Sequence, residues 1–237
     1  MISRTSSQAT ANSAGPSKGW RAPPNGRRCA RCFPTSAACE SSISVAASAG
    51  SAAGLLNTGA KEVLGLDLSE KMLARARAAG PDAGIVYERA DLDELSLPPT
   101  AFDLAYSSLA LHYVSDAARL FQTVHRCLVP GGHFVFSTEH PIYMAPTHPG
   151  WSVDAEGRKT WPVDRYLVEG PRKTDWLAKG VVKHHRTIGT TLNTLIRCGF
   201  TIEHVEEFRP TDAQIAAKPE LAEELDRPMF LLVSARR

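Results

Sequence analysis

The chain has 237 residues, of which 43% are apolar, and its formal net charge is +2. This length and apolar content suit one α/β domain with a sizeable core. Its longest apolar runs are too short to span a bilayer, and it lacks the basic excess typical of nucleic-acid-binding proteins. Its five cysteines are typical of reduced thiols. We therefore expect a cytoplasmic protein that binds neither a membrane nor nucleic acid.

The first 58 residues differ from the rest of the chain. They carry six basic residues and one acidic residue, Glu40, whereas residues 59–237 have a net charge of −3. Their Ser- and Arg-rich, acid-poor composition leaves a targeting extension open. Cys29 and Cys32 leave a metal or redox pair open, but no second Cys or His pair stands at zinc-site spacing. We expect no metal site, and we expect this segment to be disordered.

The clearest local pattern begins after this segment. Residues 63–67 form an apolar run that ends on Asp67, and Ser69 then precedes good helix formers up to Gly80. An unbroken apolar run predicts a buried parallel strand, and Ser69 is a suitable N-cap. In doubly wound α/β folds an acid at this position binds the ribose hydroxyls of a nucleotide. A solvated surface Asp67 is the alternative.

The same unit repeats downstream. Residues 85–92 predict a strand that ends near Asp91, and residues 102–113 predict another that runs into a loop. Residues 116–128 have helical periodicity, and after Pro130-Gly131-Gly132 a further strand is expected at 133–137. Strands that alternate with helices predict a mainly parallel sheet.

The periodicity stops after Pro141. Residues 142–180 are rich in Pro, Gly and aromatic residues, with Trp151, Trp161 and Trp176 among them. An insertion of this length suggests a functional cap, whose tryptophans either contact an apolar or planar ligand or only pin the cap to the body. A strand at 181–187, a helix at 190–198 and two closing strands at 201–208 and 229–235 are expected to follow.

Three stretches in this series, GAKEVLGLDLSEKML, ADLDELSLPPTAFDLAYSSLALHYV and LVPGGHFVFSTEHP, resemble the class I S-adenosylmethionine-dependent methyltransferases. The resemblance is to the small-molecule, type 11-like branch and runs from about Gly59 to the C-terminus. It implies a doubly wound, mostly parallel seven-stranded Rossmann-like sheet with an antiparallel final pair. The cofactor would be S-adenosyl-L-methionine, and the partner a small-molecule methyl acceptor.

The resemblance also implies a set of cofactor-binding residues. Asp67 would bind the ribose, while Leu68 and Met72 would flank the adenosine. Asp91 and Leu92 would contact the adenine, with Asp93 solvated beyond them. Ser107 and His112 match the loop that closes over the methionine part.

The glycine-rich signature of the family, D-x-G-x-G-x-G, is missing upstream of Asp67's strand, where residues 41–56 are rich in Ser and Ala. Read one base earlier, suitable codons for residues 40–59 permit V-L-D-L-G-C-G-F-G-W-F-C-R-W-A-A-E-H-G. We therefore interpret residues 1–58 as an out-of-frame translation and residues 59–237 as the methyltransferase domain. The first strand and helix are then expected to be absent or disordered.

Methyl transfer needs a base only where the acceptor must lose a proton. His140 follows the strand whose carboxyl end should face the ligands, and is our candidate catalytic residue. Tyr143, His185 and Arg186 are the candidate substrate-binding residues, and in similar relatives an HHRT stretch faces the acceptor pocket. A surface His-His-Arg and a mere positioning role for His140 remain open.

Two other functions also remain open. A nucleotide-dependent oxidoreductase shares the acidic residue at the end of the strand. A cofactor-free relic or pseudoenzyme would act only as a binding module. The sequence does not identify the acceptor, because one fold serves many substrates.

Overall fold

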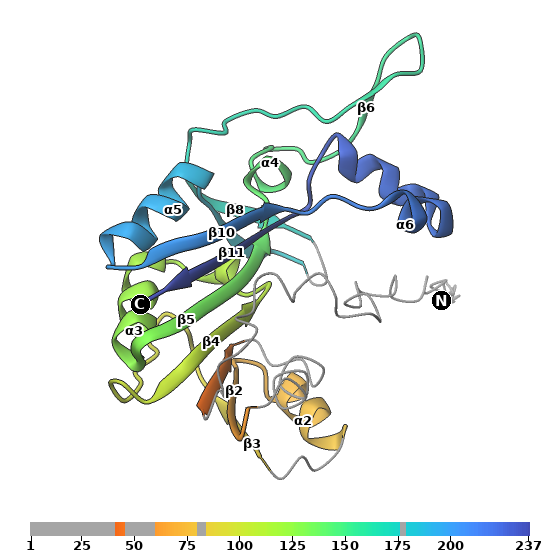
Figure 1. Ribbon diagram of the computed structural model, residues 1–237. Coiled ribbons are helices and arrows are strands. Elements are labelled where there is room, and N and C mark those ends of the chain that lie inside the picture. The colour runs from red at the N-terminus through yellow and green to blue at the C-terminus, as the bar shows by residue number, and fades with distance from the viewer. Residues whose placement is uncertain (1–40, 46–59, 80–83, 176–178) are drawn as a thin grey trace, which may run out of the picture.

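The computed structural model describes residues 41–45, 60–79, 84–175 and 179–237. These residues form a seven-stranded sheet of order β10-β11-β5-β4-β1-β2-β3 (Figure 1). Its strands are β1 (Ser41–Val45), β2 (Glu62–Asp67), β3 (Ile85–Arg89), β4 (Phe102–Ser108), β5 (Leu128–Glu139), β10 (Thr201–Glu207) and β11 (Phe230–Arg236). The helices are α2 (Glu70–Ala78), η2 (Leu111–Tyr113), α3 (Ala117–Cys127), α4 (Pro141–Met144), α5 (Ile188–Arg197), α6 (Asp212–Ala217) and η3 (Pro219–Leu225).

Strands β1 to β5 are mutually parallel, and β10 and β11 pair antiparallel at one end of the sheet. Parallel strands need crossover connections, which α2 and α3 supply here. The doubly wound, mostly parallel seven-stranded sheet with an antiparallel final pair is therefore confirmed.

The first strand was expected to be absent or disordered, and the strand at Ser41–Val45 shows that this prediction is wrong for the strand. Strand β1 occupies the slot between β2 and β4, with Ile43 level with Leu64 on one side and Ala105 on the other. Pairing through the backbone satisfies the hydrogen-bonding groups of both neighbours whatever the side chains are. The expected first helix, together with Cys29, Cys32, Glu40 and Trp176, lies outside the described residues.

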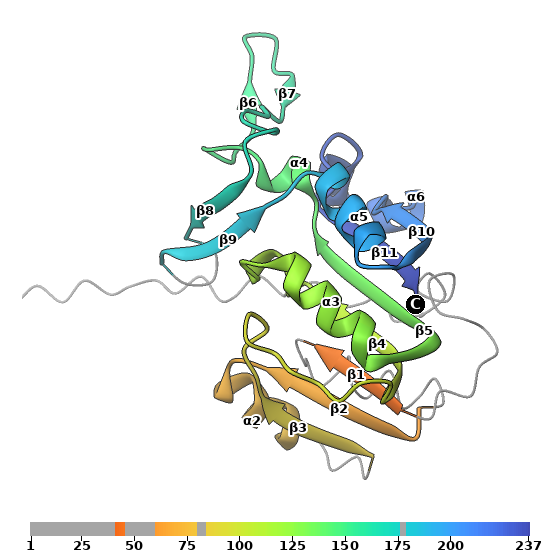
Figure 2. The same cartoon turned by 90° about the vertical axis from the view of Figure 1, so that its left-hand side faces the viewer.

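Helices cover the two faces of the sheet. Helix α3 lies with α5 on one face, and α2 lies on the other face beside β2 and β3 (Figures 1 and 2). Asp116 caps α3 by accepting a hydrogen bond from Arg119 N (3.0 Å), and Phe121 packs against Phe134 and Phe136 of β5. This aromatic cluster anchors the central strands whose carboxyl ends form the candidate site.

The segment after β5 forms a cap at the carboxyl end of that strand. It contains α4, the short hairpin of β6 (Ser152–Val153) and β7 (Lys159–Thr160), and the ribbon of β8 (Gly170–Thr174) and β9 (Val181–His185). The hairpin projects away from the sheet (Figure 2). Strand β9 matches the strand expected over 181–187. Among the helices of the described ranges, none is long and apolar enough to cross a bilayer.

Candidate active site

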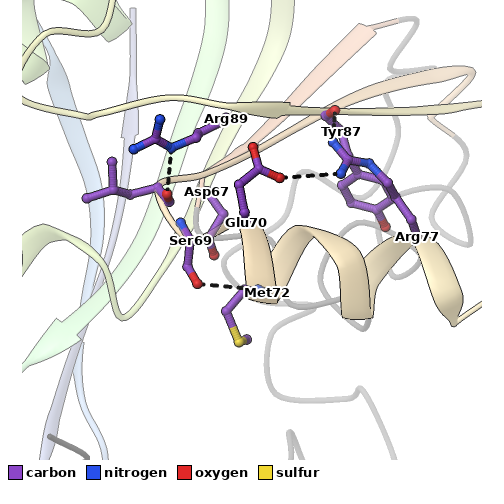
Figure 3. Close-up of polar contacts among 8 residues, drawn as sticks. Asp67, Ser69, Glu70, Met72, Arg77, Tyr87 and Arg89 are labelled. Atoms are coloured by element: carbon purple, nitrogen blue, oxygen red, sulfur yellow. Dashed lines mark hydrogen bonds and ion pairs between the residues drawn. The ribbon is translucent and has the colours of Figure 1, made fainter.

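The turn after β2 holds the carboxylate of Asp67 at the sheet edge (Figure 3). Ser69 N donates to Asp67 Oδ1 (2.8 Å), and Ser69 Oγ accepts a hydrogen bond from Met72 N (3.3 Å). Arg89 Nε donates to the carbonyl oxygen of Leu68 (3.1 Å) and ties the turn to β3. The strand end, the cap of α2 and the position of the carboxylate are thus fixed together.

A cavity of about 250 Å³ lies beside this turn. It brings together Asp67, Leu68, Asp91 and Leu92, four of the predicted cofactor residues. Leu68 is 54% exposed, so its apolar surface is available to a ligand in this cavity. Met72, on α2, does not line this cavity. A cavity with apolar side chains and a carboxylate at its edge suits a nucleoside, because the carboxylate can accept hydrogen bonds from the ribose hydroxyls.

Asp93 also lines the cavity, but its carboxylate is not simply solvated as expected. Asp93 Oδ1 accepts hydrogen bonds from Ser115 N (3.0 Å) and Asp116 N (3.1 Å), and Oδ2 accepts one from Ser115 N (3.1 Å). Burial raises the pKa of Asp93, but these hydrogen bonds outweigh it and leave the pKa below its usual value. Asp93 therefore joins the loop after β3 to the start of α3.

Ser107 and His112 lie deeper in the molecule. Ser107 is 1% exposed on β4, and its Oγ has no hydrogen-bond partner among the described residues. His112 Nδ1 lies 3.3 Å from Glu139 N, from which it accepts a hydrogen bond. Burial, with the nearby Lys183 and Arg186, lowers the pKa of His112 to about 3. His112 is therefore neutral and fixes the end of β5, and it lines a separate small cavity of about 30 Å³.

The candidate base, His140, has both ring nitrogens engaged. Nδ1 accepts a hydrogen bond from Ile142 N (3.1 Å) as the N-cap of α4, and Nε2 lies 2.8 Å from Glu207 Oε1. The side chain is fully buried, and burial lowers its pKa, with Glu207 offsetting part of the effect. A base needs a free lone pair, which this geometry does not provide. The arrangement supports a structural role for His140 rather than the catalytic role expected.

The cap encloses a larger cavity of about 810 Å³ at the end of β5. Tyr143 lines it as expected, and its ring stacks on Trp161 with centroids 5.9 Å apart and an interplanar angle of 3°. Trp161 Nε1 also donates to the carbonyl oxygen of Ile142 (3.0 Å). Trp151 and Trp161 also line the cavity, and Trp161 in addition ties the segment after β7 to α4.

Arg227, which precedes β11, completes the aromatic wall of this cavity. Its guanidinium carbon lies 5.0 Å from the ring centre of Tyr143, 5.2 Å from that of Trp151 and 4.6 Å from that of Trp161. Its NH2 donates to Glu224 Oε1 (2.9 Å). These cation–π contacts hold the C-terminal segment against the cap.

The other two candidate substrate residues do not line the cap cavity. His185 Nε2 lies 2.8 Å from the carbonyl oxygen of Tyr166, and its ring is fully buried. Arg186 donates to the carbonyl oxygens of Val114 and Ser115 after η2. His185 fixes the cap and Arg186 clamps η2, so neither contact supports the expected role in acceptor binding.

Two residues absent from our predictions lie at the base of the cap cavity. Lys183 Nζ lies 2.5 Å from Glu139 Oε1, and both side chains are at most 10% exposed. Burial raises the pKa of Glu139, and Lys183 offsets only part of this effect. Glu139 Oε2 has no hydrogen-bond partner in the part of the chain that the structure describes.

Comparisons with known proteins give the family. The methyltransferase domain family matches residues 43–136. The crystal structure of an S-adenosylmethionine-dependent methyltransferase from Mesorhizobium loti is 72% identical, with a TM-score of 0.84 over 89% of this chain and 96% of that one. The chain belongs to the S-adenosylmethionine-dependent methyltransferases. An uncharacterized protein of Haemophilus influenzae is 33% identical to this methyltransferase over 194 residues, which are 77% of this chain and 74% of that protein.

S-adenosylmethionine is the cofactor of this methyltransferase, and the described residues fit it. The 250 Å³ cavity offers Asp67 for the ribose and an apolar bed of Leu68 and Leu92 for the adenine. Further into the molecule, Ser107 Oγ has no hydrogen-bond partner among the described residues and could bond to a ligand. The turn after β1, where the glycine-rich motif belongs, lies outside the described residues.

Proposed function

We propose that this methyltransferase transfers the methyl group to a small-molecule acceptor that binds in the cap cavity. The observation that supports it is the 810 Å³ cavity at the carboxyl end of β5, walled by Tyr143, Trp151 and Trp161. Ligands of open α/β sheets bind outside the carboxyl ends of the strands, and small molecules favour apolar pockets with a few polar groups.

The acceptor specificity in this proposal belongs to the cap. The malonyl-[acyl-carrier protein] O-methyltransferase of Pseudescherichia vulneris is 34% identical over 109 residues, which are 41% of that protein. A trans-aconitate 2-methyltransferase of Acidovorax matches over only 32% of its length. The chain spans less than half of both proteins, so their substrates do not carry over to it.

In this proposal, one set of residues binds the cofactor and another binds the acceptor. Asp67, Leu68 and Leu92 hold the nucleoside, and Tyr113, which lines the same cavity, lies toward the cap. When bound, the cofactor would supply a methyl group on a positively charged sulfur, and that sulfur would be the leaving group of an in-line displacement. The aromatic wall of the cap excludes water and orients the acceptor, and such alignment supplies much of the rate enhancement of a displacement reaction.

The test uses S-adenosylmethionine labelled in its methyl group and pools of small molecules, with the products read by mass spectrometry. We expect label in a small-molecule product. Trp161→Ala should raise the acceptor KM by about tenfold or more while cofactor affinity stays within about twofold. Val153→Ala, on the exposed hairpin, is the matched control.

Two outcomes would contradict the proposal. One is cofactor binding without any product from the small-molecule pools, which is what a binding module would give. The other is a normal acceptor KM in the Trp161→Ala protein, which would place the acceptor outside the cap cavity.

A further inference from the structure

The Glu139–Lys183 ion pair is buried between the cap and the sheet. Lys183, on β9, lies 44 positions along the chain from Glu139 at the end of β5, and their side chains are 5% and 10% exposed. Removing two charges from water is costly before their attraction is counted, so such a pair is weak evidence for stability. Its place in a cavity wall makes this pair a candidate functional group.

The pair lies between the two larger cavities. Glu139 and Lys183 both line the cap cavity. Lys183 Nζ also lies 5.9 Å from the ring centre of Tyr113, and Tyr113 lines the nucleoside cavity. The reacting methyl group must pass from the nucleoside side to the acceptor side, and this pair marks where the two sides meet.

The other groups around Glu139 leave its carboxylate as the proton acceptor. His112, on η2, has its Nε2 3.9 Å from Glu139 Oε1 and is kept neutral by burial, which lowers its pKa to about 3. Burial and the charge of Glu139 raise the pKa of Tyr113 on η2 and of Tyr143 on α4. Lys183 occupies Oε1, and Oε2 has no partner among the described residues.

We propose that Glu139 is the catalytic residue that takes the proton of the acceptor, and that Lys183 is a positioning residue that orients its carboxylate. This rests on the proposed function of the cap cavity. The acceptor heteroatom forms a bond to the methyl carbon while the carbon–sulfur bond breaks and its electron pair stays on the sulfur. Glu139 takes the proton of that heteroatom. The acceptor is therefore a compound whose attacking heteroatom carries a proton, a hydroxyl, an amine or a thiol, because a carboxylate arrives without a proton to lose.

The test compares two cofactor analogues and needs no acceptor. S-adenosylhomocysteine lacks the methyl group, and sinefungin carries a primary amine in its place. An ionised Glu139 near that position should favour sinefungin. Glu139→Gln should lower the ratio of sinefungin affinity to S-adenosylhomocysteine affinity by about tenfold, as expected for the loss of a charge-assisted hydrogen bond. Because both analogues carry the same nucleoside, weak binding at the nucleoside site lowers both affinities equally and leaves their ratio unchanged.

Glu156→Gln, an exposed carboxylate on the cap hairpin, is the matched control and should leave the ratio unchanged. Because Glu139→Gln leaves Lys183 buried without a counter-charge, the double variant Glu139→Gln/Lys183→Gln is measured as well, and it should lose the preference to the same extent. An unchanged ratio in a folded Glu139 variant would overturn the assignment.

The role of Lys183 has its own readout. In the wild type, the preference for sinefungin should fall as the pH falls through the pKa of Glu139. Lys183→Gln removes the neighbouring cation and should move this fall to higher pH, whereas Lys183→Arg should leave it in place. A purely structural lysine would not move the pH profile, so an unshifted profile in Lys183→Gln would refute the positioning role. None of these measurements depends on where the acceptor binds.

Discussion

Asp93 accepts hydrogen bonds from the backbone of Ser115, with its two carboxylate oxygens 3.0 and 3.1 Å from Ser115 N. The two residues come from the loop after β3 and from the segment just before α3. A carboxylate that accepts backbone N–H groups at the start of a helix acts like an N-cap. Asp93 therefore stabilises the wall of the nucleoside cavity through contacts within the protein, not through a contact with the ligand.

The first prediction follows from this contact. Asp93→Ala removes the acceptor of Ser115 N and Asp116 N, and we expect it to destabilise the protein by about 1–2 kcal/mol, as loss of an N-cap does. This lowers Tm by about 2–8 °C in a protein of this size. Glu94→Ala, an exposed neighbour, is the control for thermal unfolding. Equal Tm values for the two variants would contradict the structural role of Asp93.

The second prediction concerns cofactor affinity. Asp67→Ala removes the carboxylate proposed to pair with the ribose hydroxyls, and loss of a charge-assisted hydrogen bond costs about 1.5–3 kcal/mol, or a tenfold to more than hundredfold loss of affinity. Glu62→Ala, at the exposed opposite end of the same strand, is the control. Calorimetric titration with S-adenosylhomocysteine measures both. Similar affinities in the two variants would contradict the position of the ribose at Asp67.

The contrast between Asp67 and Glu139 shows what the sequence could predict. Asp67 was predicted to end a strand, as it does, because an apolar run, an acidic residue and a helix cap are adjacent in the chain, and such local patterns fix a strand end. Glu139 and Lys183 become neighbours only because β8 and β9 fold back over the end of β5, and the strand pattern was expected to end at 137. Arg227 reaches the tryptophans through the fold alone, and its neighbours in the sequence give no signal.

Three other candidate residues show what the sequence could not predict. His140 was chosen for its place after the strand whose carboxyl end faces the ligands, and His185 and Arg186 for the HHRT stretch, but each forms its hydrogen bonds with the protein framework. Buried polar groups need partners, and satisfying them is the more frequent use of such residues. Their identity was visible in the sequence, but their partners were not.

The third prediction concerns pH. His112 has its pKa lowered from 6.5 to about 3, mainly by burial, so between these values the unfolded chain binds a proton that the folded protein does not. Stability must therefore fall as the pH falls below 6.5, and by pH 5 the loss from this one residue is about 2 kcal/mol relative to pH 7. His112→Asn should show a smaller difference between the two pH values in urea unfolding.

In the His112→Asn protein the free energy of unfolding should still depend on pH to some extent. Burial also lowers the pKa of four further histidines: His125, His140, His184 and His185. His148→Asn, at an exposed position in the cap, should keep the wild-type slope. If His112→Asn keeps it too, His112 is protonated in the folded protein.

The fourth prediction tests the structural role of His140. Asn is a good N-cap, so His140→Asn should keep the cap of α4 and lose the contact with Glu207, whereas His140→Ala loses both. We expect Tm to fall in the order wild type, Asn, Ala, with S-adenosylhomocysteine affinity unchanged. If both variants keep the wild-type Tm but abolish methyl transfer to the identified acceptor, His140 is catalytic after all.

The last prediction concerns the gene and the turn after β1. Strand β1 is in place between β2 and β4, so the sheet itself gives no reason to expect weak cofactor binding. What remains is the sequence after β1, where residues 46–59 lack the acidic residue and the three alternating glycines that let the backbone approach the cofactor in this family. Resequencing should reveal a base inserted or deleted near codon 58, with an upstream frame that encodes D-x-G-x-G-x-G.

The restored chain should bind S-adenosylmethionine at least about tenfold more tightly than the present one, since close backbone contacts to a charged ligand are worth more than about 1.4 kcal/mol. An intact frame whose codons cannot yield those glycines, or equal affinity of the two chains, would refute the frameshift.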